Sequence, residues 1–132
     1  MGLRVELKPG ERFIVGRSII TNGDKRSQFF LEGREPVLRE KDIMRISEAT
    51  TPARRIYMAV QLIYLEGDSE EQNRLYLSLC QDFVAAAPSA SSLITTMSGY
   101  LLQGLPYKAL HEARQLIGYE DSLLSQPNRR ER

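Results

Sequence analysis

The sequence predicts an α+β protein in which a small antiparallel β-barrel or meander precedes an antiparallel bundle of about four helices. The hydrophobic periodicity changes near residue 50 from that of strands to that of helices. Gly and Pro residues punctuate both parts at the intervals expected of short elements. Of 132 residues, 42% are hydrophobic and 27% are charged, a composition typical of globular proteins. We therefore expect a β domain over 1–48, a helical bundle over 49–125 and a disordered basic tail over 126–132.

Five short strands are predicted in the N-terminal part. The first alternates apolar and charged residues and ends at the Pro9-Gly10 turn. The second ends at Gly16, and Asn22-Gly23-Asp24 predicts a hairpin with a type I′ turn between the third and fourth strands. Pro36 places the last strand at a sheet edge, because proline lacks the backbone donor. The predicted strands cover residues 3–8, 13–15, 18–21, 27–31 and 36–38.

Four helices are predicted after residue 50, with apolar residues recurring every three or four positions. Thr51-Pro52 begins the first, as a hydroxyl cap followed by proline. Asp68 and Glu71 have capping-box spacing for the second. Pro106 begins the fourth, which we expect to stop at Gly118 with one further turn after it. Because the connections are short, neighbouring helices should be antiparallel.

Charge and hydropathy indicate a cytoplasmic protein. Neither a run of about 18 apolar residues nor an N-terminal signal peptide is recognisable, so we expect no membrane association. The formal net charge is +1, but residues 1–48 carry ten basic and eight acidic side chains, whereas residues 49–126 carry five and eight. An anionic partner should therefore prefer the N-terminal part or the tail.

The residues that usually carry enzyme chemistry are sparse in this chain. His111 is the only histidine, and Cys80 is the only cysteine, within an apolar helical pattern. A single cysteine excludes an intrachain disulfide and multi-cysteine metal sites. The acidic cluster at 66–71 lacks calcium-loop spacing and fits helix capping instead. We therefore expect no catalytic residue, no metal and no cofactor.

Basic residues interleaved with aromatic ones distinguish the predicted β domain. Such a pattern suits single-stranded RNA, whose phosphates meet Lys and Arg while unstacked bases meet aromatic rings. The alternative is that Phe13, Phe29 and Phe30 form the core and the charges only solvate the outer face. The candidate RNA-binding residues here are Arg12, Arg17, Lys25, Arg26, Arg34, Arg39 and Lys41.

Several segments resemble the FlbT family of bacterial flagellum-biosynthesis regulators, in order and at similar spacing over residues 3–124. The most recognisable is 50–65, TTPARRIYMAVQLIYL. The others are LKPGERFIVG at 7–16, NG at 22–23, PVLREKDI at 36–43, YKAL at 107–110 and RQL at 114–116.

This resemblance implies a post-transcriptional role in flagellum assembly. Members of the family associate with the 5′ untranslated leader of flagellin mRNA and alter its translation or decay. They are usually described as repressors, and activating roles are possible within the family. They function beside a second small regulator, FlaF, so flagellin mRNA, flagellin and FlaF are the expected partners.

The β segment is also weakly similar to the RNA-binding carbon-storage regulator CsrA. The similarity ends in Val37-Leu38-Arg39-Glu40 before a helix. In that family the matching arginine contacts RNA, which makes Arg39 the preferred single residue, and it implies a composite site across a homodimer. The chain departs from the carbon-storage regulators in its helical half, and Arg4 matches their N-terminal contact strand only loosely.

Two hypotheses for function remain open at this point. The first is an RNA-binding regulator that uses the basic β face together with Arg54 and Arg55 at the helical start. The second is a protein-interaction module whose helical half binds flagellin or FlaF through an amphipathic groove, with indirect effects on mRNA. The interface residues under the second hypothesis are Tyr57, Tyr64, Tyr76 and Tyr100.

Overall fold

The computed structural model describes residues 2–125, which divide into two compact units between Ile43 and Met44. We call residues 2–43 the β-unit and 44–125 the helical unit. The division lies five residues before the expected one because Gln61 holds Met44 to the first helix. The Gln61 side chain accepts a hydrogen bond from Met44 N at 2.8 Å and donates to Met44 O at 3.0 Å. The tail over 126–132 lies outside the described residues.

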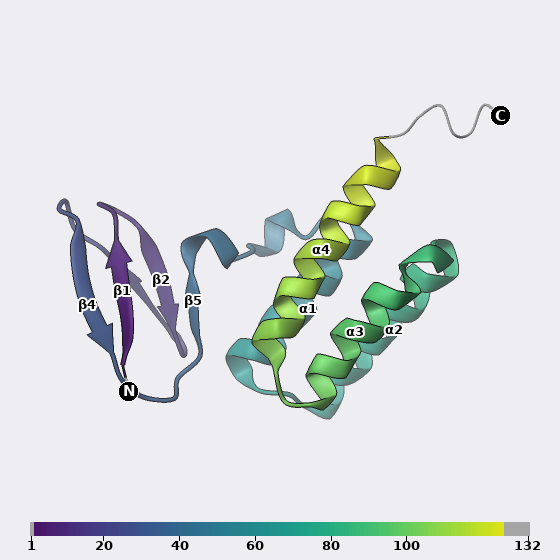
Figure 1. Cartoon of the computed structure of the whole chain (residues 1–132), viewed down its shortest axis with the longest axis horizontal. Helices are drawn as coiled ribbons and strands as arrows, with labels where there is room; N and C mark the ends of the chain where they lie inside the picture. The colour runs from purple at the N-terminus through teal and green to yellow at the C-terminus, as the bar shows by residue number, and fades with distance from the viewer. Residues whose placement is uncertain (1, 126–132) are drawn as a thin grey trace. The chain divides into compact units, whose positions relative to one another are not determined.

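The β-unit contains five short antiparallel strands in two small sheets, which confirms the α+β class but not a closed barrel or a meander (Figure 1). One sheet pairs the first and fourth strands, and the other has the order third–second–fifth. The last strand lies at a sheet edge, as Pro36 predicted. The strands are β1 (Leu3–Leu7), β2 (Arg12–Val15), β3 (Ser18–Thr21), β4 (Ser27–Leu31) and β5 (Val37–Arg39).

The predicted hairpin at Asn22-Gly23 is wrong, because β3 pairs with β2 and not with β4. Within residues 2–125 only glycines have positive φ, and Gly23 is not among them, so no type I′ turn forms there. Instead, Asn22 Nδ2 donates to the carbonyls of Leu7, Lys8 and Lys25 at 2.8–3.1 Å. The asparagine thus ties together the β1–β2 and β3–β4 connections.

The β2–β3 hairpin turns at Gly16-Arg17, the two residues between the paired Val15 and Ser18. Gly16 has φ of 60° and Arg17 does not have positive φ, as a type II′ turn requires of its two central residues. Gly16 N also donates to Pro36 O at 2.7 Å, which joins this turn to the start of β5.

The core of the β-unit lies between the inner faces of the two sheets. Val5, Leu7 and Phe13 are fully buried there. The Phe13 and Phe29 rings meet edge to face, with centroids 6.0 Å apart. Since alternate residues of a strand point to opposite faces, Phe29 faces this core and Phe30 faces away from it.

The helical unit has four α-helices within the described residues, in agreement with the sequence prediction (Figure 1). Helix α1 packs against α2 and α4, and α3 packs against α4. None of these helices is long and apolar enough to cross a membrane. Their bounds are α1 (Pro52–Glu66), α2 (Glu70–Ala86), α3 (Ser91–Leu102) and α4 (Pro106–Leu124), with short 3₁₀ turns η1 (Glu40–Asp42), η2 (Ile46–Glu48) and η3 (Pro88–Ala90).

Two predicted helix ends differ from the structure. Ser69, and not Asp68, caps α2, since its hydroxyl accepts from Gln72 N at 3.1 Å. Helix α4 also continues through Gly118 to Leu124, because its buried face extends to Glu120 and that packing outweighs the weak helix propensity of one glycine. The predicted cap of α1 is confirmed, with Thr51 Oγ1 accepting from Arg54 N at 3.2 Å.

Candidate nucleic-acid interface

The β-unit has two opposite ends, at which different loops gather (Figure 1). At the first, β1 and β5 finish while β2 and β4 begin, and the side chain of Asn22 links the loops there. At the second, the Gly16-Arg17 turn lies beside the chain that enters β5. We call residues 8–12, 22–27 and 39–42 the Asn22 end, and residues 16–17 and 32–36 the Gly16 end.

Five of the seven predicted basic residues of the β-unit gather at the Asn22 end. The two sheets meet there through Gly10 N, which donates to Gly23 O at 2.9 Å, and Asn22 N, which donates to Glu11 O at 2.9 Å. These two backbone hydrogen bonds hold the 8–12 loop against the 22–27 loop, in addition to the packing of their side chains. The basic residues brought together are Arg12, Lys25, Arg26, Arg39 and Lys41.

Arg12 and Arg39 are positioned by neighbouring strands. Arg39 lies opposite Phe13 in the β2–β5 ladder, so its backbone is one position from that of Arg12, while strand alternation places the two side chains on opposite faces of the sheet. Arg12 N donates to the Glu40 carboxylate at 2.7 Å, which fixes the start of β2 against η1. Both arginine side chains are partly buried, whereas Lys25 and Arg26 are exposed. The pair is thus anchored while the loop cations stay at the surface.

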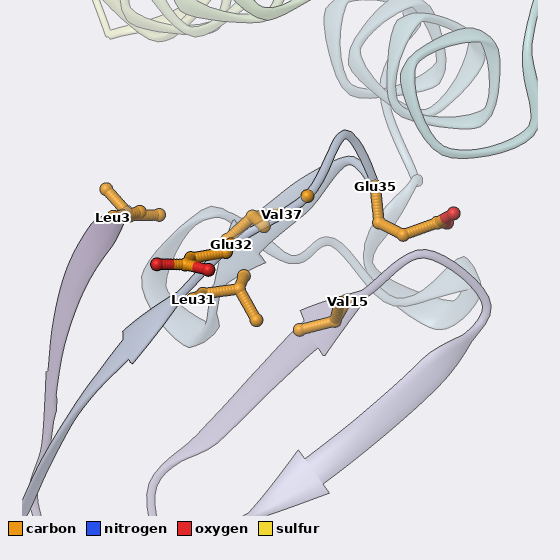
Figure 2. Close-up of a pocket in the computed structure, with 7 residues that line it drawn as sticks. Leu3, Val15, Leu31, Glu32, Glu35 and Val37 are labelled. Carbon is orange, nitrogen blue, oxygen red and sulfur yellow. The ribbon is translucent and has the colours of Figure 1, made fainter. Parts of the chain in front are cut away.

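The Gly16 end contains the other two basic residues, Arg17 and Arg34, and differs in character. The open edge of the core lies here, in a small pocket between the sheets. Figure 2 shows Leu31 and Val15 facing one another across this pocket, with the Glu32 carboxylate beside Leu31 and the Glu35 side chain pointing away from them. Acidic side chains beside an apolar opening do not favour a polyanion. The predicted basic surface is therefore split between two ends.

Arg54 and Arg55 belong to the helical unit and lie at the start of α1. Arg54 is engaged in structure: its guanidinium lies 4.0 Å from Glu120 Oε1 and 3.7 Å from Asp121 Oδ1. Glu120 is a buried carboxylate whose Oε2 accepts from Ala53 N at 2.9 Å. Arg55 is exposed. Of the two, only Arg55 is presented to a ligand without a competing role in the fold.

The phenylalanines of the β-unit divide between core and surface. Phe13 and Phe29 pack in the core, which confirms the structural alternative for these two rings. Phe30 is instead 67% exposed, on the outer face of the β1–β4 ladder. The sequence hypothesis counted all three rings as aromatics near the basic residues and did not single out Phe30, although the strand alternation of 27–31 contained the signal.

The four tyrosines of the protein-interaction hypothesis also differ in exposure. Tyr57 and Tyr76 are buried, so neither ring is available to a partner. The Tyr57 hydroxyl accepts a hydrogen bond from Arg114, and the Tyr76 hydroxyl shares one of 2.8 Å with Ser98 Oγ. Tyr64 and Tyr100 are partly exposed. Tyr64 lies 5.5 Å from the Tyr107 ring, centroid to centroid.

Cys80 and His111, the residues weighed for chemistry, have ordinary surroundings. Cys80 is buried in α2, which confirms its predicted place, and burial raises the pKa of its thiol to about 11. A thiol with so high a pKa is a poor nucleophile at neutral pH. His111 is exposed, with its ring 4.7 Å from that of Tyr107. Among the described residues, no three His, Cys, Asp or Glu side chains are grouped to hold a metal ion.

The fold and the arrangement of charges define a two-unit α+β protein with basic side chains gathered at one end of its β-unit. The sequence model of the family described as "Flagellar protein FlbT" matches residues 3–124. The chain belongs to this FlbT family of flagellar proteins. The similarity to the carbon-storage regulator CsrA receives no corresponding support, since no solved structure matches the chain.

Relatives in other bacteria are similar over nearly the whole chain. The "Probable flagellum biosynthesis repressor protein FlbT" of Rhodopseudomonas palustris (strain TIE-1) is 47% identical, covering 95% of this chain and 99% of the relative. Its namesake in Bradyrhizobium diazoefficiens is 46% identical, over 96% of this chain and 87% of the relative. The "Flagellum biosynthesis repressor protein FlbT" of Caulobacter vibrioides is 37% identical, over 94% and 90%.

Proposed function

We propose that this protein represses flagellum biosynthesis after transcription, by binding the 5′ untranslated leader of flagellin mRNA in the bacterial cytoplasm. The observation that carries the proposal is the gathering of Arg12, Lys25, Arg26, Arg39 and Lys41 at the Asn22 end. The names of the relatives support the repressor role. The leader, as a single-stranded polyanion, is the ligand that such a surface suits.

The electrostatics of the β-unit favour one binding end over the other. At the Asn22 end, two strands and the adjoining loops supply cations, and neutralising several phosphates together releases several counterions. The Asn22 end carries six basic side chains against four acidic ones (Glu11, Asp24, Glu40 and Asp42), whereas at the Gly16 end Glu32 and Glu35 equal Arg17 and Arg34 in number. RNA should therefore approach along the end where the loops meet Asn22.

Arg39 is the preferred single contact within this surface. It ends an edge strand, so a bound RNA strand can pass beside it without displacing a neighbouring strand. The weak similarity to the carbon-storage regulators supports the same residue. A homodimer, which we also propose from that similarity, would present two such ends to one leader.

Binding of purified protein to a labelled flagellin leader over a series of salt concentrations tests the proposal. We expect affinity to fall as salt rises, and Arg39→Ala to reduce the slope of log affinity against log salt by about 0.7 for each phosphate that the variant no longer neutralises. Arg17→Ala, at the Gly16 end of the same unit, is the matched control. Absence of binding at low salt would exclude direct recognition by this chain alone.

A second candidate function is the binding of flagellin or FlaF by the helical unit. An open groove there has Ile63, Tyr64, Leu101 and Pro106 among its lining residues, together with Gly67, Asp68, Asn73 and Gly104. Next to these residues in sequence, Leu102 is 90% exposed at the end of α3, and such a leucine is available to an apolar partner. Flagellin and FlaF are the partners that the family resemblance implies.

Pull-down of flagellin and of FlaF with the wild-type protein tests this second function. Leu102→Asp should abolish capture without unfolding the chain, because its side chain contributes almost no burial. Leu124→Asp, at an exposed leucine at the end of α4, is the matched control. Equal capture by both variants would remove the exposed surface at Leu102 from consideration.

A further inference from the structure

We infer that the outer face of the β1–β4 ladder is a base-stacking platform for single-stranded RNA, with Phe30 as its stacking side chain. This inference rests on the proposed RNA-binding function and deepens it. The proposed function so far supplies cations for phosphates but no group for the bases. A flat, exposed aromatic ring on a sheet supplies that missing part.

Phe30 has no role in the core of the β-unit. Its neighbour Phe29 faces inward and packs on Phe13, and the strand alternation places Phe30 outward, with 67% of the residue exposed. An exposed phenylalanine in a two-stranded sheet gains little burial for folding. Because every base has a π-face, such a ring binds single strands with little preference for sequence.

The side chains around Phe30 are those of a nucleotide-binding face. Arg4 lies directly opposite Phe30, and Gln28 lies opposite Glu6 on the same outer face. Arg4 Nη2 is 3.3 Å from Glu6 Oε2, which holds the guanidinium over the sheet. An arginine at this position can meet a phosphate or stack on a base, and the Gln28 amide can donate to and accept from a base edge.

Gly2, just before β1, carries no side chain next to Phe30. A Cβ atom at this position would lie 3.7 Å from Phe30 Cβ and 3.5 Å from Glu32 Cγ. The next residue on the outer face of β1 therefore presents no side chain against Phe30.

The platform is continuous with the cationic Asn22 end. β4 begins at Ser27, directly after Lys25 and Arg26, and Phe30 follows Arg26 by four residues. At about 3.3 Å per residue, the two positions are about 13 Å apart. A single strand that places phosphates at the Asn22 end can therefore lay a base on Phe30. Cations followed by an aromatic ring match the phosphates and bases of a nucleic acid better than they match a protein ligand.

Phe30→Ala separates stacking from charge in a binding assay with the flagellin leader. Stacking contributes about 1–3 kcal/mol per base, so the variant should bind about 5- to 150-fold more weakly. Its salt slope should equal that of the wild type, because no cation is removed. Phe30→Tyr should bind nearly as well as the wild type, since the ring is kept.

Phe30→Trp makes the stacking directly visible, because the chain contains no tryptophan. We expect the fluorescence of this single introduced tryptophan to be quenched on titration with the leader RNA. Ile19→Trp is the matched control: Ile19 is exposed on β3 of the other sheet, away from the proposed platform, and the signal from that position should stay constant.

The outcomes distinguish this inference from the function on which it rests. If the wild type does not bind the leader at low salt, the proposed function fails. If the wild type binds, but Phe30→Ala binds equally well and the fluorescence of Phe30→Trp is not quenched, the stacking platform is wrong while RNA binding stands. If Phe30→Ala instead loses capture of flagellin or FlaF with RNA binding unchanged, the face is a protein contact and the inference is overturned.

Discussion

Glu120 illustrates how a single buried charge can tie distant parts of the helical unit together. Only 6% exposed, it accepts a hydrogen bond from the first turn of α1 and balances Arg54. A carboxylate near a helix N-terminus is also favoured by the helix dipole. Since α1 and α4 are separated by most of the unit's sequence, this contact fixes the pairing of its first and last helices.

Replacing Glu120 should destabilise the helical unit measurably. In Glu120→Ala the buried Ala53 N–H loses its acceptor, and such a loss costs about 1–3 kcal/mol. Urea unfolding followed by circular dichroism at the helix band measures the change. Asp121→Ala, which removes an exposed partner of Arg54, should cost less than about 1 kcal/mol. Equal effects of the two variants would contradict the buried role.

The thiol of Cys80 should make stability depend on alkaline pH. Burial raises its pKa from 9.0 to about 11, so the folded protein holds a proton that the unfolded chain releases between these values. The free energy of unfolding should therefore fall as pH rises from 9 to 11, by up to about 1.4 kcal/mol per pH unit.

Urea unfolding at pH 8, 9, 10 and 11 measures this dependence, and Cys80→Ala separates the contributions. Burial also raises the pKa of Tyr76, which adds a similar loss of stability above pH 10. In Cys80→Ala the fall that begins at pH 9 should be reduced, while the part from Tyr76 remains. An unchanged profile in the variant would contradict the role of the thiol.

At the scale of elements, we predict opposite effects of alanine at two glycines: Gly16, in the observed turn, and Gly23, in the turn that the sequence predicted. Gly16→Ala forces a Cβ into positive φ and against Glu35, which costs about 1–2 kcal/mol from the backbone conformation alone. Gly23→Ala meets no atom within 4 Å and needs no positive φ, so it should be tolerated.

Amide hydrogen exchange in β2 and β5 measures this difference. Protection should fall about 5- to 30-fold in Gly16→Ala, the equivalent of about 1–2 kcal/mol, and remain near the wild-type value in Gly23→Ala. The opposite ranking would restore the hairpin at Asn22-Gly23 that the sequence pattern favoured.

The sequence was informative about which elements form and much less about how strands pair. Alternation over residues 3–8 and the Thr51-Pro52 cap are local signals, and both produce the predicted elements. Strand pairing depends on contacts between distant residues. At Asn22 the side chain bonds to three carbonyls, two of them in the β1–β2 connection, and thereby overrides the local preference of Asn-Gly for a hairpin.

At the scale of the whole molecule, the candidate site shows the same limit. The basic residues could be selected from the sequence, but their division between two ends follows from the strand pairing, which places Arg17 far along the ladder from Arg12. Tyr57 and Tyr76 cannot be told from surface tyrosines by residue type, and only the packed bundle shows that they are buried. To select Phe30 as a surface residue, one must know which of the two adjacent phenylalanines faces the core, and only the structure shows that it is Phe29.

The most direct test of RNA recognition at the Asn22 end compares two double variants in binding to the labelled flagellin leader. Arg12→Ala with Arg39→Ala removes two cations from the Asn22 end, and Arg17→Ala with Arg34→Ala removes two from the Gly16 end, so the change in net charge is identical. We predict that the first variant loses most of its affinity and much of its salt dependence, while the second binds like the wild type. Equal losses would mean that RNA responds only to net charge, and would contradict a localised site at the Asn22 end.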